Sequence, residues 1–364
     1  MNIKEVTNYL EVLAPLSYAE DFDNVGLLVG NYDTVISGIL VTLDTLEATV
    51  DEAIAKKCNL IVSFHPIIFV GLKKLNGNSY VERVVLKAIK NDIAIYATHT
   101  ALDNSKDGVS AKMCQVLGLQ NASVLIPRKG IIKKLTTFVP SQNATALKNA
   151  LFEAGAGSIG NYDNCCFQTE GESTFRGNEH SNPVIGEKGK VHTEKETQIS
   201  LVFESKNEAS ILETLKKKHP YEEVAYELVT TENVHQSIGL GMIGELPKAM
   251  KEKDFLLYLK KTMQTNCIRH SELLHKKIKK VAVLGGAGSF AISNAKRAGA
   301  DAYVSADFKY HEFFKAEKSI LLTDIGHYES EQFTKNLLVD YLTKKFSNFA
   351  VILSEKSTNP IYYI

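Results

Sequence analysis

Short apolar runs alternate with amphipathic helical patterns in two segments of this chain, one toward each end. The runs in the first segment are 38–43, 59–64 and 93–98, and those in the last are 281–284, 302–305, 319–324 and 349–354. Between them, apolar residues recur at helical spacing. Because unbroken apolar strands joined by helices are typical of mainly parallel sheets covered by helices, the pattern predicts an α/β fold with mainly parallel or mixed sheets.

The middle of the chain has a different pattern. Strand-like segments KLTTFVP, QISLVFE and VAYELV surround a polar stretch from Gln168 to Gln198 and a helical pattern, EASILETLKKK. This order is typical of a small α+β module. We therefore expect one α/β unit made of residues 1–127 and 235–364, split by an inserted domain at 128–234.

Composition excludes several classes of protein. The 364 residues carry 42 basic and 42 acidic side chains, without the basic excess of a dedicated nucleic-acid binder. No run approaches 18 uninterrupted apolar residues, so no membrane span is expected, and the N-terminus lacks the pattern of a signal peptide. Five cysteines without a CxxC pair are typical of a reduced, cytoplasmic protein. We expect neither a membrane nor a nucleic acid as a partner.

Side chains that bind metals follow the predicted strands. They are His65, His99, Asp103, His327 and Glu331. Ligands of open α/β sheets bind at the carboxyl ends of strands, which is where these residues fall. Two pairs have His-x-x-x-acid spacing, which puts both side chains on one face of a helix. Imidazole with carboxylate suits zinc, iron or manganese, although such spacing also arises by chance.

The two outer segments share one order of elements: a strand, a helix, a second strand, and a third strand that is followed by a histidine and, four residues later, an acid. We interpret the two segments as distant copies of each other.

Two further motifs leave more than one interpretation open. GGAGSFA (285–291) follows a strand and fits G-x-G-x-x-A, with Asp307 about twenty residues later. It could be a dinucleotide fingerprint, a holder of a substrate phosphate, or a tight turn that needs small residues. His311 follows another predicted strand in DFKYHE. It could act as a general acid or base, contact substrate, or be structural.

A set of motifs in a fixed order carries a family resemblance. They are DFDNVGLLVG (21–30), HPIIF (65–69), GLKKL (71–75), HTALD (99–103), HPYEEVAYEL (219–228), SADFKYHE (305–312) and GHYESE (326–331). With them the chain resembles, over essentially its whole length, the Nif-three-like family, also called GTP cyclohydrolase I type 2 homologs.

The resemblance implies a toroidal homohexamer with a dinuclear metal centre in its outer segments and a PII-like or CutA-like inserted domain. The metal ligands that it implies are His65, His99, Asp103, His327 and Glu331, with Glu331 as the bridging carboxylate. Phe64 stands where the family usually has a second histidine. Five side chains then fill one site, or two sites completed by water, so we expect one or two divalent metal ions per chain.

Three functions follow as hypotheses. The first is a metal-dependent hydrolase that acts on a small molecule, a nucleotide such as GTP or a phosphoester, with His311 assisting proton transfer. The second is a non-enzymatic metal store, chaperone or regulatory sensor that uses the same site. The third is a dinucleotide-dependent enzyme that uses GGAGSFA. A family resemblance does not fix the substrate.

Overall fold

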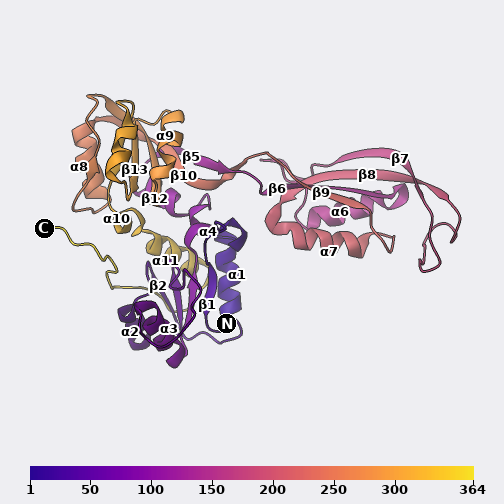
Figure 1. Ribbon diagram of the computed structural model, residues 1–364, viewed down its shortest axis with the longest axis horizontal. Helices are drawn as coiled ribbons and strands as arrows, with labels where there is room; N and C mark the ends of the chain where they lie inside the picture. The colour runs from indigo at the N-terminus through magenta and orange to yellow at the C-terminus, as the bar shows by residue number, and fades with distance from the viewer. The chain divides into compact units, whose positions relative to one another are not determined.

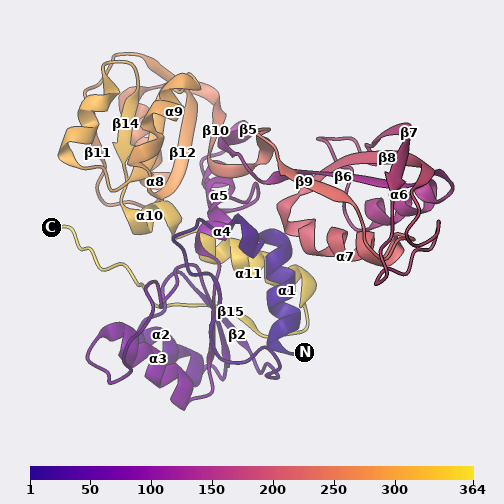
Figure 2. The same cartoon turned by 45° about the vertical axis from the view of Figure 1, so that its right-hand side comes forward.

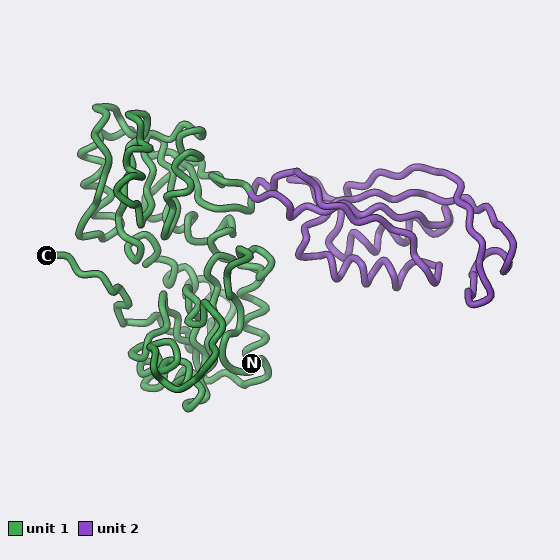
Figure 3. Tube along the Cα trace, viewed as in Figure 1, with its two compact units in different colours: residues 1–127, 237–364 green, residues 128–236 purple.

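The computed structural model describes all 364 residues, which form two compact units (Figure 3). Unit 1 contains Met1–Pro127 and Ser237–Ile364, and unit 2 contains Arg128–Gln236. Unit 1 holds two sheets and unit 2 a third. These mixed sheets and their flanking helices confirm the predicted α/β fold class. No helix has both the length and the apolar character needed to cross a membrane.

The first sheet of unit 1 has five strands in the order β1-β4-β3-β2-β15. Their bounds are Gly26–Val29 (β1), Ala94–Ala97 (β4), Leu60–Ser63 (β3), Ile39–Thr42 (β2) and Val351–Leu353 (β15). All are parallel except β1, which runs antiparallel to β4. Every residue of β2, β3 and β4 is buried, which explains their unbroken apolar sequences.

Helices cover both faces of this sheet (Figures 1 and 2). They are α1 (Ile3–Leu13), α2 (Glu47–Ala55), α3 (Tyr80–Lys90) and α11 (Thr334–Lys345). Val41 and Val62 pack with α1 and α11 in one core. Leu40 and Ile61, each one residue earlier on its strand, pack with α2 and α3 in another. This alternation is the period-2 geometry of a strand.

The last predicted strand lies in a different sheet from the one that the sequence pattern indicated. The run 349–354 reads as part of the final segment's set of strands, yet β15 pairs in parallel with β2 of the first sheet. The reason is the packing of α11: its Leu338 and Leu342 are fully buried in the same core as Ile3 and Leu10. The chain therefore leaves α11 beside the first sheet.

The second sheet of unit 1 has six strands in the order β11-β14-β13-β12-β10-β5. Their bounds are Arg269–His270 (β11), Leu321–Asp324 (β14), Ala302–Ala306 (β13), Lys277–Ala287 (β12), His235–Lys251 (β10) and Gln120–Arg128 (β5). Strands β12, β13 and β14 are parallel, and β10 and β11 run antiparallel to their neighbours β12 and β14. Helices pack on it through two separate cores: α5 (Val109–Val116) and α8 (Glu252–Thr262) in one, α9 (Ile292–Arg297) in the other.

Unit 2 is a four-stranded antiparallel sheet, β7-β8-β6-β9, with two helices on one face (Figures 1 and 2). The strands are Phe167–Phe175 (β7), His192–Glu204 (β8), Ile132–Pro140 (β6) and Tyr226–Thr230 (β9). The helices are α6 (Ala144–Glu153) and α7 (Glu208–Lys218). Leu147 and Leu151 from α6 share a core with Ile211 and Leu215 from α7. The polar stretch from Gln168 to Gln198 contains nearly all of β7, the connection 176–191 and the first half of β8, which pairs antiparallel with β7.

Two five-residue helices occupy equivalent places, each after a parallel strand of one of the two mixed sheets of unit 1. Helix α4 (His99–Asp103) begins two residues after β4 ends, and α10 (His327–Glu331) begins three residues after β14 ends. Each helix begins with a histidine and ends with an acid. The fold therefore presents a histidine and a carboxylate at the carboxyl ends of the strands of each sheet.

Candidate metal centre

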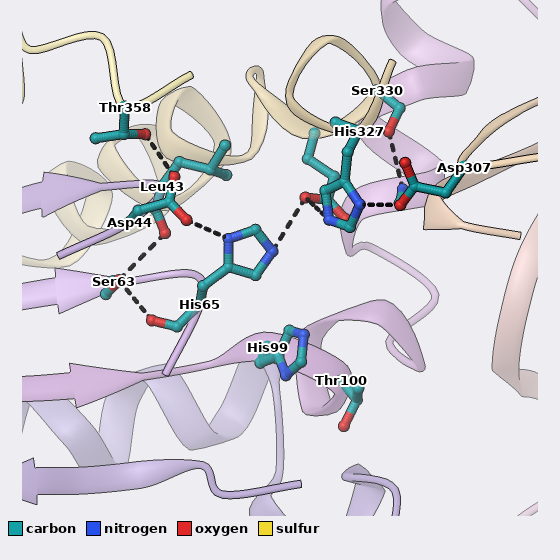
Figure 4. Close-up of polar contacts among 12 residues, drawn as sticks. Leu43, Asp44, Ser63, His65, His99, Thr100, Asp307, His327, Ser330 and Thr358 are labelled. Carbon is teal, nitrogen blue, oxygen red and sulfur yellow. Dashed lines mark hydrogen bonds and ion pairs between the residues drawn. The ribbon is translucent and has the colours of Figure 1, made fainter. Parts of the chain in front are cut away.

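Three of the predicted ligands come together in the structure: His65, His327 and Glu331. Figure 4 shows the two histidines with their aspartate partners. His65 lies two residues after β3, while His327 and Glu331 are the first and last residues of α10 and share one face of it. Glu331 Oε2 is 3.2 Å from His65 Nε2 and 3.3 Å from His327 Nε2. One donor atom from each residue lies within 4.8 Å of the other two, so the three could hold a metal ion.

The carboxylate of Glu331 is the centre of this group. Its side chain is 4% exposed, and its Oε2 is buried without a hydrogen bond of normal geometry. Two ligands at about 2.0–2.1 Å from a tetrahedral zinc ion lie about 3.3 Å apart. The separations of Oε2 from the two imidazole nitrogens are those of ligands around a metal. The donor set therefore fits a divalent cation.

Each of three histidines forms a hydrogen bond through its Nδ1 atom with an aspartate carboxylate. The Nδ1–O distances are 2.8 Å for His65 with Asp44, 2.6 Å for His327 with Asp307, and 2.8 Å for His99 with Asp23. This arrangement fixes the orientation of each ring and leaves Nε2 as the coordinating nitrogen. It is the arrangement found behind most metal-binding histidines.

The charges of the group shift its pKa values strongly. Burial alone would lower the pKa of both histidines, but their carboxylate partners raise it to about 10 for His65 and about 11 for His327. Burial alone would raise the pKa of Glu331, but the close approach and the positive charge of the two histidines lower it to about 2. The group is thus an ion-paired triad in which a cation would compete with protons.

His99 and Asp103, the other two predicted ligands, lie beside this group and outside the set of three. The His99 ring centroid is 5.3 Å from that of His65. Burial, followed by the charge of Glu331, raises the pKa of the Asp103 carboxyl well above its ordinary value. A cation placed between these carboxylates would favour the ionised, ligating form of Asp103.

The glycine-rich turn at 285–288 lies directly against α10. Gly286 has φ +68°, and a Cβ there would lie 2.4 Å from Glu331 Oε1. Its backbone N–H donates to the hydroxyl of Ser330 at 2.8 Å. The Gly286 N–H is therefore not free to bind a phosphate group. The absence of a side chain at Gly286 leaves space for the carboxylate of Glu331.

Phe64 and His311 each have a clear place in the structure. Phe64 is fully buried, with ring centroids 4.8 Å from His65 and 5.6 Å from His99, so it fills space beside both imidazoles. His311 lies in the 3₁₀ helix Tyr310–Ala316 that follows Asp307. Its ring centroid is 5.1 Å from that of Tyr310. The proton-transfer role of His311 stays a prediction.

The sequence patterns missed two residues of the centre, Asp44 and Asp23. Asp44 follows the apolar run 38–43 just as His65 follows the next run, so the rule applied to the histidines would have found it. Asp23 lies in the DFDNVG motif but on no predicted element. Its pairing with His99, 76 residues away, is a tertiary contact that no local pattern shows.

The fold and this His–Glu cluster define a split α/β protein with a candidate metal site, and comparison with known proteins places it. The family model described as Duf34/NIF3 (NGG1p interacting factor 3) matches residues 1–360, and the chain belongs to that family. This confirms the resemblance.

Relatives match along the whole chain. The GTP cyclohydrolase 1 type 2 homolog of Bacillus subtilis (strain 168) is 36% identical, over 100% of this chain and 99% of the relative. The protein of that name from Staphylococcus aureus is 32% identical over all of both chains. A solved Bacillus cereus protein related to NIF3 has a TM-score of 0.84 at 35% identity, covering 100% of this chain and 99% of that one.

Proposed function

We propose that this protein is a divalent-metal-dependent hydrolase whose centre is formed by His65, His99, Asp103, His327 and Glu331. The observation that carries the proposal is the Glu331 oxygen. It is buried, lacks a normal hydrogen bond, and lies at ligand-like distances from two imidazole nitrogens. We propose one or two ions of zinc, iron or manganese per chain, with Glu331 as the bridge where two are bound.

The proposed chemistry divides between the metal and the chain. A divalent ion held here would act as a Lewis acid and lower the pKa of a water molecule toward neutrality. Asp44, Asp307 and Asp23 hold the three imidazoles in orientation through their Nδ1 atoms. Gly286 leaves room for Glu331. His311, on the segment after Asp307, would carry the proton to the leaving group.

The substrate class is a small molecule, either a nucleotide or another phosphoester. The names of the relatives refer to GTP cyclohydrolase, which supports a nucleotide. The test is hydrolysis across a panel of nucleotides and phosphoesters by protein loaded with zinc, manganese or iron. Activity that disappears in His327→Ala supports the proposal. Full metal loading without hydrolysis of any panel member would refute it.

The role of His311 has its own test. His311→Ala should lower turnover roughly 10²- to 10⁴-fold, the usual contribution of a general acid or base. Metal content should not change, because the residue is not among the proposed ligands. Unchanged turnover would remove His311 from the mechanism.

Phe64 favours a second candidate function, a non-enzymatic metal store, chaperone or sensor. A fully buried phenyl ring beside His65 and His99 replaces a ligand that the family usually has. Fewer ligands make a weaker, more exchangeable site. Metal that leaves within seconds on addition of a chelator, from protein without hydrolytic activity, would favour this function over the hydrolase.

We further propose a homohexamer, which the family resemblance implies. A segment with several exposed apolar side chains supports an assembly surface in unit 1. These side chains are Phe69, Val70, Leu75 and Tyr80. Light scattering on the eluting protein should give six times the chain mass of 40.2 kDa. A monomer at micromolar concentration would contradict the proposal.

A further inference from the structure

A threonine lies behind two of the three carboxylates that orient the histidines. The Oδ2 of Asp23 accepts hydrogen bonds from the hydroxyl and, at 3.0 Å, the backbone N–H of Thr100, which follows His99 in α4. The Oδ2 of Asp44 accepts one from the hydroxyl of Thr358 at 2.5 Å (Figure 4). The same three-part chain of histidine, aspartate and threonine is thus built twice. Thr100 is local to its histidine, whereas Thr358 comes from the C-terminal segment, 314 residues after Asp44.

The C-terminal segment is anchored to the first sheet just before Thr358. After β15, the Ser354 N–H donates to the Val41 carbonyl at 2.8 Å. The Ser354 hydroxyl and the Glu355 N–H donate to the two oxygens of Glu52, at 2.6 and 2.9 Å. Ser354 and Glu52 are buried. These hydrogen bonds fix the position of residues 354–355, from which the chain continues to Thr358 and its contact with Asp44.

Asn359, the residue after Thr358, contacts the helix α10, which carries His327 and Glu331. Asn359 Nδ2 donates to Glu329 Oε1 at 3.2 Å. Glu329 is a buried residue of α10, the helix that carries His327 and Glu331. Two consecutive residues, Thr358 and Asn359, therefore bond the carboxylate behind His65 and the helix that holds the other two side chains of the cluster.

We infer that Thr358 and Asn359 form a clip that sets the affinity and exchange rate of the metal centre. His65 follows a strand of the first sheet, whereas His327 and Glu331 follow a strand of the second, so the centre is complete only while these elements keep their spacing. The clip forms hydrogen bonds with Asp44, which orients His65, and with Glu329 of the helix that carries His327 and Glu331. Thr358 is a positioning residue: its hydroxyl holds the Asp44 oxygen that faces away from His65, which fixes the His65 ring. This inference depends on the proposed metal centre.

The test compares Thr358→Val with Thr358→Ser in the full chain. Valine keeps the shape of threonine and removes the donor, while serine keeps the donor. Zinc affinity is measured by competition with a chromogenic chelator, and zinc release by its rate after excess chelator is added. We expect Thr358→Val to bind zinc roughly 10- to 100-fold more weakly and release it faster, with Thr358→Ser close to wild type. Asn359→Ala should weaken binding in the same direction.

A control and a spectroscopic readout separate positioning from general structure. Tyr362→Ala removes an exposed side chain of the same segment and should leave both zinc parameters unchanged. The visible absorption of Co²⁺-loaded protein reports ligand geometry and should change in Thr358→Val but not in Thr358→Ser. Wild-type affinity, release rate and Co²⁺ spectrum in Thr358→Val would overturn the clip. If wild-type protein binds no metal, the proposed function itself fails.

Discussion

Replacing Glu331 with glutamine removes the charge on which the candidate metal centre depends and keeps the shape of the side chain. The two histidines lower the pKa of Glu331 from 4.5 to about 2. At 1.36 kcal/mol for each pKa unit, this difference corresponds to about 3 kcal/mol of stability in the metal-free protein. The side chain is 4% exposed, so solvent screens little of it. We expect Glu331→Gln to lower the free energy of unfolding by about that amount.

The pH dependence of this loss follows from the directions of the shifts. The lowered pKa of Glu331 gives stability that is present above pH 4.5 and lost as pH falls toward 2. The raised pKa values of His65 and His327 give stability that is present below pH 6.5 and lost as pH rises through about 10 and 11. The difference between wild type and variant should therefore be largest between about pH 4.5 and 6.5.

The assay is urea unfolding of chelator-treated protein, followed by circular dichroism at several pH values. Glu329→Gln is a matched control for the metal-free measurement alone, because Glu329 is buried in the same helix and is bonded to the neutral amide of Asn359, which belongs to the clip. Zinc at 100 times its dissociation constant should add about 2.7 kcal/mol to wild type and much less to Glu331→Gln. A variant as stable as wild type at pH 6, or equally stabilised by zinc, would refute the reasoning.

Three further predictions concern the same centre. Gly286→Ala should weaken zinc binding roughly tenfold or more in a chelator competition, since its Cβ would lie 2.4 Å from the central carboxylate, whereas Gly299→Ala, also at positive φ but with open space, should not. Phe64→His should raise the metal content by up to one ion per chain in elemental analysis, and unchanged content would show that Phe64 does not limit occupancy. At pH 7, zinc should displace about two protons, because His65 and His327 have pKa values of about 10 and 11. Calorimetry in buffers of different ionisation enthalpy measures the number of protons released, and no proton release would contradict the prediction.

Local patterns predicted much of the fold because burial on both faces leaves a clear trace in the sequence. The fully buried strands β2, β3 and β4 lie within the predicted runs, and α7 covers the predicted helical segment. Strand β10 was missed because its sequence, HQSIGLGMIGELPKAMK, mixes glycines, a proline and charges, and its pairing with β12 shifts register partway along. The partner of β15 was missed because strand order depends on how α11 packs.

The candidate site shows the same division between local and tertiary information. Residues that follow strands could be predicted, and the structure brings His65, His327 and Glu331 together. Their supporting partners could not all be predicted. Thr358 bonds Asp44 across 314 residues, and Asp23 bonds His99 across 76, so both contacts exist only once the chain has folded.

Metal content per chain tests the central claim most directly. Elemental mass spectrometry on purified, reconstituted protein should find one to two ions of zinc, iron or manganese per chain, with a marked loss in His327→Ala. About two would mean that water completes a site beside Phe64, and about one that Phe64 removes a site. No metal in wild type after reconstitution, or equal metal in wild type and His327→Ala, would contradict the account.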